Sequence, residues 1–232
     1  MDKLAVIALG GNALLRDNEK GTIEEQEQNT DETLENILFL LNEGYNLVIT
    51  HGNGPQVGNI LMRNDAGEAL YGIAPMPLDI CVADSQGGIG YMIERILRNV
   101  FTRHGIRKSI VTLVTMVCVD PNDSAFENPS KQIGRYYTQD EAETLNREKG
   151  WNFMQSPKNK LFRRVVASPK PTCVLNYETI RQLAQQGHIV IAVGGGGVPV
   201  YFDEAGMVRT ENAVVDKDLA SAVLAHQIGA EA

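Results

Sequence analysis

Apolar residues gather in short, nearly unbroken runs, which are typical of strands buried on both faces of a sheet. The runs cover residues 4–9, 46–50, 110–119 and 189–193. Between them, apolar side chains recur at helical spacing over residues 34–41, 89–100 and 180–184. Strands alternating with helices in this way predict right-handed crossovers and a mainly parallel, open α/β sheet.

Glycine-rich turns follow three of these apolar runs directly. They are Gly10-Gly11-Asn12, then His51-Gly52-Asn53-Gly54, and the four glycines 194–197. Ligands of open α/β sheets bind at the carboxyl ends of strands, where such turns expose backbone N–H groups. A tight turn is the simpler interpretation of a lone Gly-Gly. Four consecutive glycines lose much backbone entropy on folding, so for 194–197 close approach of the backbone to a ligand is the better interpretation.

Two features of the same region admit structural interpretations. His51 could act as a general base, but a lone histidine without a partner is more often a hydrogen-bonded structural residue. The glycines in the segment 85–90 precede a helix whose apolar face starts at Ile89. In the first turns of a helix they can serve close packing as well as ligand contact.

The triplet Asp216-Lys217-Asp218 follows the apolar pair Val214-Val215, which we interpret as the end of a strand, and precedes a helix. A lysine fixed at such a junction is a positioned cation, which phosphoryl transfer requires. The alternative is a helix N-terminus in which an aspartate caps and the lysine is solvated. Taken alone, the triplet favours that alternative; together with the glycine turns it favours a phosphate site.

Residues 120–166 differ from the rest of the chain in composition and predict a small protruding subdomain inserted into the sheet domain. Turn residues open the segment, Thr138 to Glu141 has the form of a capping box, and residues 147–164 are rich in Lys and Arg. Lys131 is either a catalytic residue at the tip of this excursion or a solvated lysine. Further on, residues 203–206 predict a hairpin turn.

Composition excludes several classes of protein. The 232 residues are 43% hydrophobic, enough for a core, and the net charge of −8 argues against nucleic-acid binding. No apolar stretch is long enough to cross a bilayer and no signal-peptide layout is visible, which predicts a cytoplasmic protein without a membrane partner. Cys81, Cys118 and Cys173 are interpreted as reduced core thiols, and the histidines show no metal-ligand spacing. No P-loop motif is present.

These motifs together resemble carbamate kinase, in the amino acid kinase superfamily, and they span the chain in the order of that family. They are 8–12, 50–58, 131–134, 163–171, 194–199 and 215–218. The resemblance implies one amino acid kinase-like domain over 1–232, with a three-layer α/β/α sandwich. It also implies phosphoryl transfer between ATP and carbamate, with Mg²⁺ bound mainly through the nucleotide, and usually a homodimer. The useful direction in most such enzymes is ATP formation from carbamoyl phosphate.

Carried over by position, the resemblance implies a role for each motif. Gly10, Gly11 and Asn12 would meet the transferring phosphate, and Gly52, Asn53 and Gly54 would hold carbamate or its phosphate. Lys131 would reach in from the subdomain. Lys217 would act from the nucleotide side with Gly195, Gly196 and Gly197, while Asp216 and Asp218 orient the lysine or the metal. Ala8 stands where many relatives in the superfamily carry a lysine, which disfavours glutamate and acetylglutamate kinases.

Two departures from the family pattern qualify this expectation. Gln132 replaces the usual proline after Lys131. The sequence also ends at Ala232, whereas relatives continue with a further strand and nucleotide contacts, so an exposed sheet edge is expected. The alternative to an enzyme is therefore a catalytically impaired or non-catalytic anion-binding or assembly protein of the same fold. A dimer is expected from the resemblance and from the apolar helices 34–41 and 89–100, which exceed the needs of one sheet face.

Overall fold

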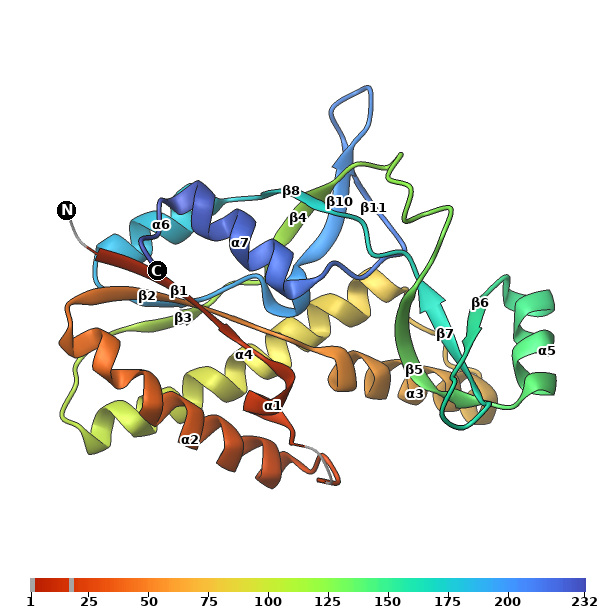
Figure 1. Ribbon diagram of the computed structural model, residues 1–232, viewed down its shortest axis with the longest axis horizontal. Helices are drawn as coiled ribbons and strands as arrows, with labels where there is room; N and C mark the ends of the chain where they lie inside the picture. The colour runs from red at the N-terminus through yellow and green to blue at the C-terminus, as the bar shows by residue number, and fades with distance from the viewer. Residues whose placement is uncertain (1–2, 17–18) are drawn as a thin grey trace.

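A four-stranded, wholly parallel sheet forms the centre of the body (Figure 1). The computed structural model describes residues 3–16 and 19–232, and the side chain of Asn12 lies outside the described part. The strand order is β1-β2-β9-β3, and the strands are β1 (Lys3–Leu9), β2 (Tyr45–His51), β9 (Ile189–Ile191) and β3 (Ile110–Thr112). The predicted parallel sheet is confirmed.

Helices cover both faces of this sheet, as Figure 1 shows with one pair below and one pair above. On one face, α2 (Ile23–Asn42) and α4 (Leu78–Arg103) pack on Leu47, Ile49 and Ile191. On the other, α6 (Tyr177–Gln185) and α7 (Lys217–Ile228) pack on Leu4, Val48 and Val190. Alternate residues of each strand thus enter opposite cores, which explains the unbroken apolar runs. The predicted three-layer α/β/α sandwich is confirmed.

A second, mixed sheet extends the body in the order β11-β10-β4-β8. β10 pairs in parallel with β4, and both outer strands pair antiparallel. The strands are β11 (Val208–Thr210), β10 (Val198–Phe202), β4 (Met116–Val119) and β8 (Pro171–Val174). The hairpin turn predicted at 203–206 joins β10 to β11, where Asp203 accepts hydrogen bonds from the backbone N–H groups of Ala205 and Met207.

The prediction of one strand over 110–119 is wrong, because the chain leaves the first sheet after Thr112 and enters the second at Met116. The buried amide of Gln86 holds the break. Its Nε2 donates to the Thr115 carbonyl at 3.1 Å, and its Oε1 accepts from the Thr115 N–H at 2.8 Å. The Thr115 carbonyl also accepts from the Val198 N–H at 2.9 Å, so a side chain from α4 fixes the residue at which the chain enters the second sheet.

The glycine cluster 85–90 lies in the middle of α4, not in its first turns as the sequence suggested. The helix begins at Leu78 because buried positions such as Cys81, Val82 and Ser85 continue its inner face upstream. Gly90 has a packing role, because a Cβ there would overlap Cγ2 of Thr112 on β3. The glycine therefore lets helix and strand approach closely.

A third, antiparallel sheet projects from the body at the right of Figure 1. We name residues 131–166 the antiparallel unit; it contains β5 (Lys131–Tyr137), α5 (Gln139–Lys149), β6 (Asn152–Gln155) and β7 (Phe162–Val166), in the sheet order β5-β7-β6. The predicted capping box at Thr138 and Glu141 is present and starts α5. The unit lies within the range 120–166 proposed from the sequence as a subdomain.

Helix α3 (Gly54–Tyr71) joins the body to the antiparallel unit. A Cβ on Gly58 of α3 would stand 3.5 Å from backbone atoms of Gly134 on β5. Two short elements complete the fold, the single turn α1 (Gly11–Leu14) and the 3₁₀ turn η1 (Gly194–Gly196). Both lie near the start of α3, at the carboxyl ends of β1 and β9.

Three further predictions concern the segment before α7, the edge of the first sheet and the apolar helices. Val214 and Val215 belong to no strand; Ala213 alone bridges to Ala167. β1 is an edge strand, and its Leu4 and Val6 bond to the backbone of Glu231 and Ala232. The apolar residues of helices 34–41 and 89–100 are mostly buried within the chain's own core, so these helices give no support for a dimer, which stays a prediction.

The structure tests two predictions about the class of protein, one from its cysteines and one from its helices. All three cysteines are free thiols, as predicted; Cys81 and Cys118 are buried and Cys173 is half-buried. Burial raises the pKa of Cys118 to about 12, with Cys173 across the β4–β8 pair as the next cause. Among the described residues, no helix combines the length and apolarity that crossing a membrane requires.

Candidate functional site

Most of the site residues predicted from separate stretches of sequence line one cavity of about 250 Å³. It lies where the carboxyl end of β2, the first turns of α3 and α7, η1 and the start of β5 meet. The predicted residues on its wall are Gly11, Gly52, Asn53, Gly54, Lys131, Gly195, Asp216, Lys217 and Asp218. We call this the phosphate cavity for the chemistry argued below.

Asp216 links the two ends of the site. Its Oδ1 caps α7 by accepting from the backbone N–H groups of Asp218 and Leu219, and its Oδ2 accepts from Lys131 Nζ at 3.2 Å. Burial alone would raise the pKa of Asp216, but the bonds from Lys131 and the helix N–H groups outweigh it and the pKa is lowered. Asp216 is therefore an ionised cap that also holds the lysine of the antiparallel unit.

Lys217 is the first residue of α7, and its ammonium lies beside Asp218 Oδ1 at 2.5 Å. The Lys217 side chain is 21% exposed, whereas that of Asp218 is 72% exposed. Gly52 makes room for this lysine, since a Cβ there would stand 3.3 Å from Lys217 Cδ. Asp216 is thus the cap of α7, as one interpretation of the triplet had it, and Lys217 is held in place by Asp218, while its part in phosphoryl transfer stays a prediction.

Asn53 is held in one orientation at the start of α3. It is 4% exposed, and its Nδ2 donates to Ser85 Oγ at 2.8 Å. Ser85 in turn donates to the Val82 carbonyl of α4. The sequence placed Ser85 only in a glycine-rich segment. That Ser85 orients Asn53 could not be predicted from the sequence, because the two residues meet only in the folded chain.

The four glycines 194–197 are required by the protein itself. A Cβ would meet His51 at Gly194, Asn53 at Gly195, the Val215 carbonyl at Gly196 and Val117 at Gly197. Close backbone approach is therefore real, but its partners here are protein atoms. Of the predicted set 195–197, Gly195 reaches the cavity wall, and the nucleotide role of all three stays a prediction.

Gly10 and Asn12 are less closely tied to the cavity. Gly10 is the N-cap of α1 and accepts from the Ala13 N–H, and it is not among the lining residues. The side chain of Asn12, predicted to meet the phosphate, lies outside the described residues. Of this first glycine turn, Gly11 lines the cavity.

His51 has the structural role that the sequence favoured over catalysis. The residue is 1% exposed, and its Nδ1 pairs with the Gly52 carbonyl at 2.9 Å. Burial lowers the pKa of His51 from 6.5 to about 4, against a smaller opposing effect of that carbonyl. The ring is neutral at physiological pH and lies behind the glycines of η1.

Acidification is therefore expected to destabilise the fold through His51. Below pH 6.5 the unfolded chain takes up a proton that the folded chain refuses until about pH 4, so stability falls as pH falls through this window. The full effect is about 3 kcal/mol. Urea unfolding at pH 7 and pH 4.5 should show a steeper loss for the wild type than for His51→Asn. Substitution of the exposed His226, His226→Gln, serves as control, and equal pH slopes for wild type and His51→Asn would contradict the assignment.

A basic cavity adjoins the phosphate cavity and was not predicted as a unit. It has a volume of about 540 Å³ and shares Leu15, Gly54, Pro55, Gln56 and Gln132 with its neighbour. Its charged lining residues are Lys20, Arg135 and Arg163, with no acidic side chain among them. Nε of Arg163 and Oε1 of Gln56 are buried and have no hydrogen-bond partner in the described part of the chain. Of the three basic residues, only Arg163 lies in the basic stretch 147–164, which was interpreted only as charge on the subdomain.

The arrangement is suited to holding a phosphoryl group. Two ammonium groups from elements far apart in sequence converge with the N-terminal turns of α3 and α7, which favour anions. In residues 3–16 and 19–232, no cluster of three or more His, Cys, Asp or Glu could hold a metal by itself. Asp216 and Asp218 are the carboxylates on the cavity wall, and Mg²⁺ in phosphoryl-transfer sites needs only one or two besides phosphate oxygens.

Known proteins resemble the chain over its whole length. The profile of the Amino acid kinase family matches residues 3–232. Carbamate kinase of Pyrococcus furiosus is 47% identical over 231 residues, covering 100% of this chain and 73% of that protein. A carbamate kinase-like protein of Escherichia coli, YahI, is 42% identical with the same coverage. The solved structure of Giardia lamblia carbamate kinase bound to AMP-PNP superposes with a TM-score of 0.91 at 39% identity, over 99% of this chain and 72% of that one.

Proposed function

The chain belongs to the amino acid kinase family, and from this premise we propose that it is a carbamate kinase, which transfers a phosphoryl group between carbamoyl phosphate and ADP. The observation that carries the proposal is the meeting of Lys131 and Lys217 at one small cavity bounded by two helix N-termini. Similarity to carbamate kinases over the full chain supports the choice of substrate within the family.

In the proposed reaction the bond between phosphorus and the carbamate oxygen breaks as an oxygen of ADP's terminal phosphate bonds to the same phosphorus. Carbamate leaves with the electron pair of the broken bond, and ATP is formed. Negative charge spreads over the transferred group in the transition state, and ammonium groups already in place stabilise it without reorganisation. Lys217 would act from the body and Lys131 from the antiparallel unit.

Asp216 and Asp218 would contribute to Mg²⁺ binding next to the nucleotide's phosphates, and the metal would supply charge neutralisation there. Both aspartates also hold a lysine in the structure, so they position the cations whether or not a metal is bound. The adjoining basic cavity would raise the local concentration of the anionic substrates through its three cationic side chains.

The test is ATP formation from ADP, Mg²⁺ and carbamoyl phosphate by this chain, followed with a coupled luminescence assay. We expect ATP above the uncatalysed background, and roughly 10²–10³-fold slower formation by a Lys217→Ala preparation that folds normally. A folded wild-type chain that forms no ATP would contradict the proposal. Carbamoyl phosphate or inorganic phosphate at about millimolar concentration should also raise the melting temperature, because a ligand of the native state stabilises it.

Lys131→Ala is expected to raise the KM for carbamoyl phosphate as well as lower kcat. Lys131 lies on β5, in the unit that must approach the body to enclose substrate, and its only described ion pair crosses that gap to Asp216. Its loss removes ground-state binding together with transition-state stabilisation. Steady-state kinetics with carbamoyl phosphate measures both. An unchanged KM would place Lys131 outside the substrate contact.

A non-catalytic anion-binding protein is the second candidate. It is favoured by one observation: two relatives at 42% and 44% identity, both from Escherichia coli, are named only as carbamate kinase-like. This candidate predicts a phosphate-induced rise in melting temperature without ATP formation. The same two measurements therefore separate it from the enzyme.

We further expect a homodimer, as the family resemblance implies. The described surface carries large exposed apolar side chains between the end of α3 and the start of α4, namely Leu70, Tyr71, Ile73, Met76 and Ile80. Light scattering at micromolar concentration should give twice the chain mass of 25.4 kDa. Leu70→Glu should weaken this association, whereas Phe39→Glu, an exposed apolar residue on α2, should not. A monomer in all three preparations would contradict the expectation.

A further inference from the structure

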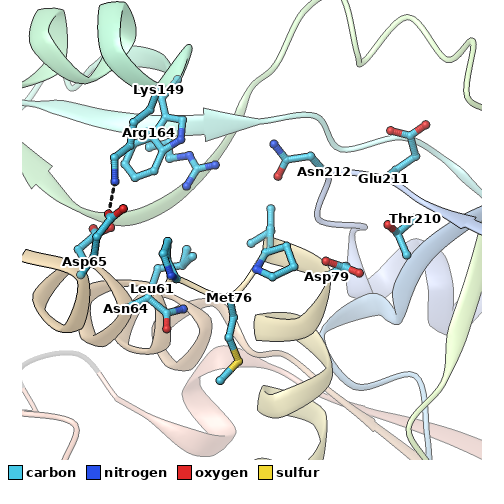
Figure 2. Close-up of a pocket in the computed structure, with 15 residues that line it drawn as sticks. Leu61, Asn64, Asp65, Met76, Asp79, Lys149, Arg164, Thr210, Glu211 and Asn212 are labelled. Atoms are coloured by element: carbon cyan, nitrogen blue, oxygen red, sulfur yellow. Dashed lines mark hydrogen bonds and ion pairs between the residues drawn. The ribbon is translucent and has the colours of Figure 1, made fainter. Parts of the chain in front are cut away.

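A second cavity, of about 620 Å³, lies between the body and the antiparallel unit (Figure 2). Its walls are α3, the segment 75–79 that opens α4, residues 210–212 after β11, and Lys149, Trp151 and Arg164 of the antiparallel unit. It shares no lining residue with the phosphate cavity. We call it the interdomain-side cavity, and its volume suits a small organic molecule.

Arg164 is the feature of this cavity that calls for a ligand. The residue is only 8% exposed, and Figure 2 shows it projecting from the wall toward the cavity. Its guanidinium makes no hydrogen bond or ion pair with any residue in the described ranges; it stacks on the Trp151 ring, with Cζ 3.9 Å from the ring centroid. A guanidinium has five N–H donors, and stacking on an aromatic ring satisfies none of them. A buried cation in this state is poised to receive a carboxylate.

Acidic side chains face the same space. Asp65, Glu68, Asp79 and Glu211 all line the cavity, and of these Glu68 is neutralised by Lys149 at 2.6 Å. Asp79 and Glu211 lie across the cavity from Arg164 in Figure 2. Burial raises the pKa of both Asp65 and Glu211, and at Asp65 the charges of Lys149 and Arg164 oppose the shift. They would be stabilised by a cation.

The charges exclude the simplest ligands. A plain anion would pair with Arg164 but would meet the field of the uncompensated carboxylates. A plain cation would pair with the carboxylates and leave the buried guanidinium without a partner. A molecule with both charges satisfies both walls.

We propose that the interdomain-side cavity binds a small zwitterion with a carboxylate beside a protonated amine, the chemical class of free α-amino acids. The carboxylate would lie on Arg164 and the amine toward Asp79 and Glu211. Such a ligand would join α4 to β7, the strand that pairs with β5 and places Val166 opposite Lys131. The binding proposed here is independent of the carbamate kinase proposal.

Trp151 provides a direct readout, because it is the single tryptophan of the chain and lines the cavity. We expect at least one standard amino acid, titrated up to about 10 mM, to change its fluorescence and raise the melting temperature of the full chain. Acetate and methylammonium, which each carry one of the two charges, should have no such effect at that concentration. No response to any standard amino acid would overturn the proposal, as would acetate acting as strongly as the best amino acid.

Variants test whether the fluorescence and melting-temperature changes come from Arg164 and from the carboxylates opposite it. Arg164→Met should weaken binding by at least about tenfold, the effect of losing one charged contact. If that variant does not fold, Glu211→Gln on the opposite wall serves the same purpose, with a smaller loss of affinity expected. Lys217→Ala should bind as the wild type does, because the two cavities share no residue. Undiminished binding in the folded wall variants, or its loss in Lys217→Ala, would overturn the assignment of the site.

Discussion

Lys217→Ala is expected to lower kcat by roughly 10²–10³-fold, the usual cost of removing one preorganised group that stabilises transition-state charge. The structure supplies the preorganisation. Lys217 opens α7, its aliphatic stem packs against Gly52, and its ammonium is held by Asp218. The largest loss should appear in kcat because the charge on the phosphoryl group is most in need of a cation in the transition state.

Lys217→Arg should not restore activity. A guanidinium is planar and bulkier than an ammonium. Lys217 Cδ stands only 3.3 Å from where a Cβ on Gly52 would be, so the stem of an arginine has little room to shift its larger head group. Steady-state kinetics on wild type and both variants measures the effect, and circular dichroism confirms that they fold. If Lys217→Ala folded and kept near-normal turnover, the triplet 216–218 would be a helix cap without a catalytic part.

The sequence was sufficient to predict the layers and most of the cavity wall, because both follow from local pattern. Unbroken apolar runs mark strands whose alternate residues enter two cores, as Val48 and Ile49 do. Parallel strands then bring their carboxyl ends to one edge, so Gly11, Gly52 and Gly195 had to approach one another. Lys131 was harder to place. Its ion pair with Asp216 depends on how the antiparallel unit lies against the body, and no periodicity in the sequence predicts that placement.

What the sequence missed depends on single side chains acting across elements. Gln86 holds the break in the run 110–119 by bonding to both backbone groups of Thr115, and nothing within that run signals it. The charge set of the interdomain-side cavity is likewise assembled from five separate stretches, with Arg164 distinguished by burial and not by its neighbours in the chain. The glycines 194–197 were interpreted as a close approach of the backbone to a ligand, and the sequence did not predict that a Cβ at each of them would also meet protein atoms.

That last difference leads to the second large effect: Gly196→Ala is expected to destabilise the fold by more than about 3 kcal/mol. Gly196 has φ of +90°, and a Cβ there would stand 2.6 Å from the carbonyl oxygen of Val215. Because that oxygen belongs to the backbone, no side-chain rotation relieves the contact. Chemical denaturation of wild type and variant measures the difference in unfolding free energy.

Gly206→Ala separates the steric effect from the conformational one. Gly206, in the β10–β11 turn, also has positive φ, at +75°, but a Cβ there meets nothing within 4 Å. Its alanine variant should lose only about 1 kcal/mol, the cost of a left-handed conformation for a residue with a Cβ. Similar losses at both positions would contradict the steric argument. Because Val215 precedes Asp216, any Gly196→Ala protein that folds must shift the α7 cap, and with it Lys217. Turnover should then fall even at temperatures where the variant is native.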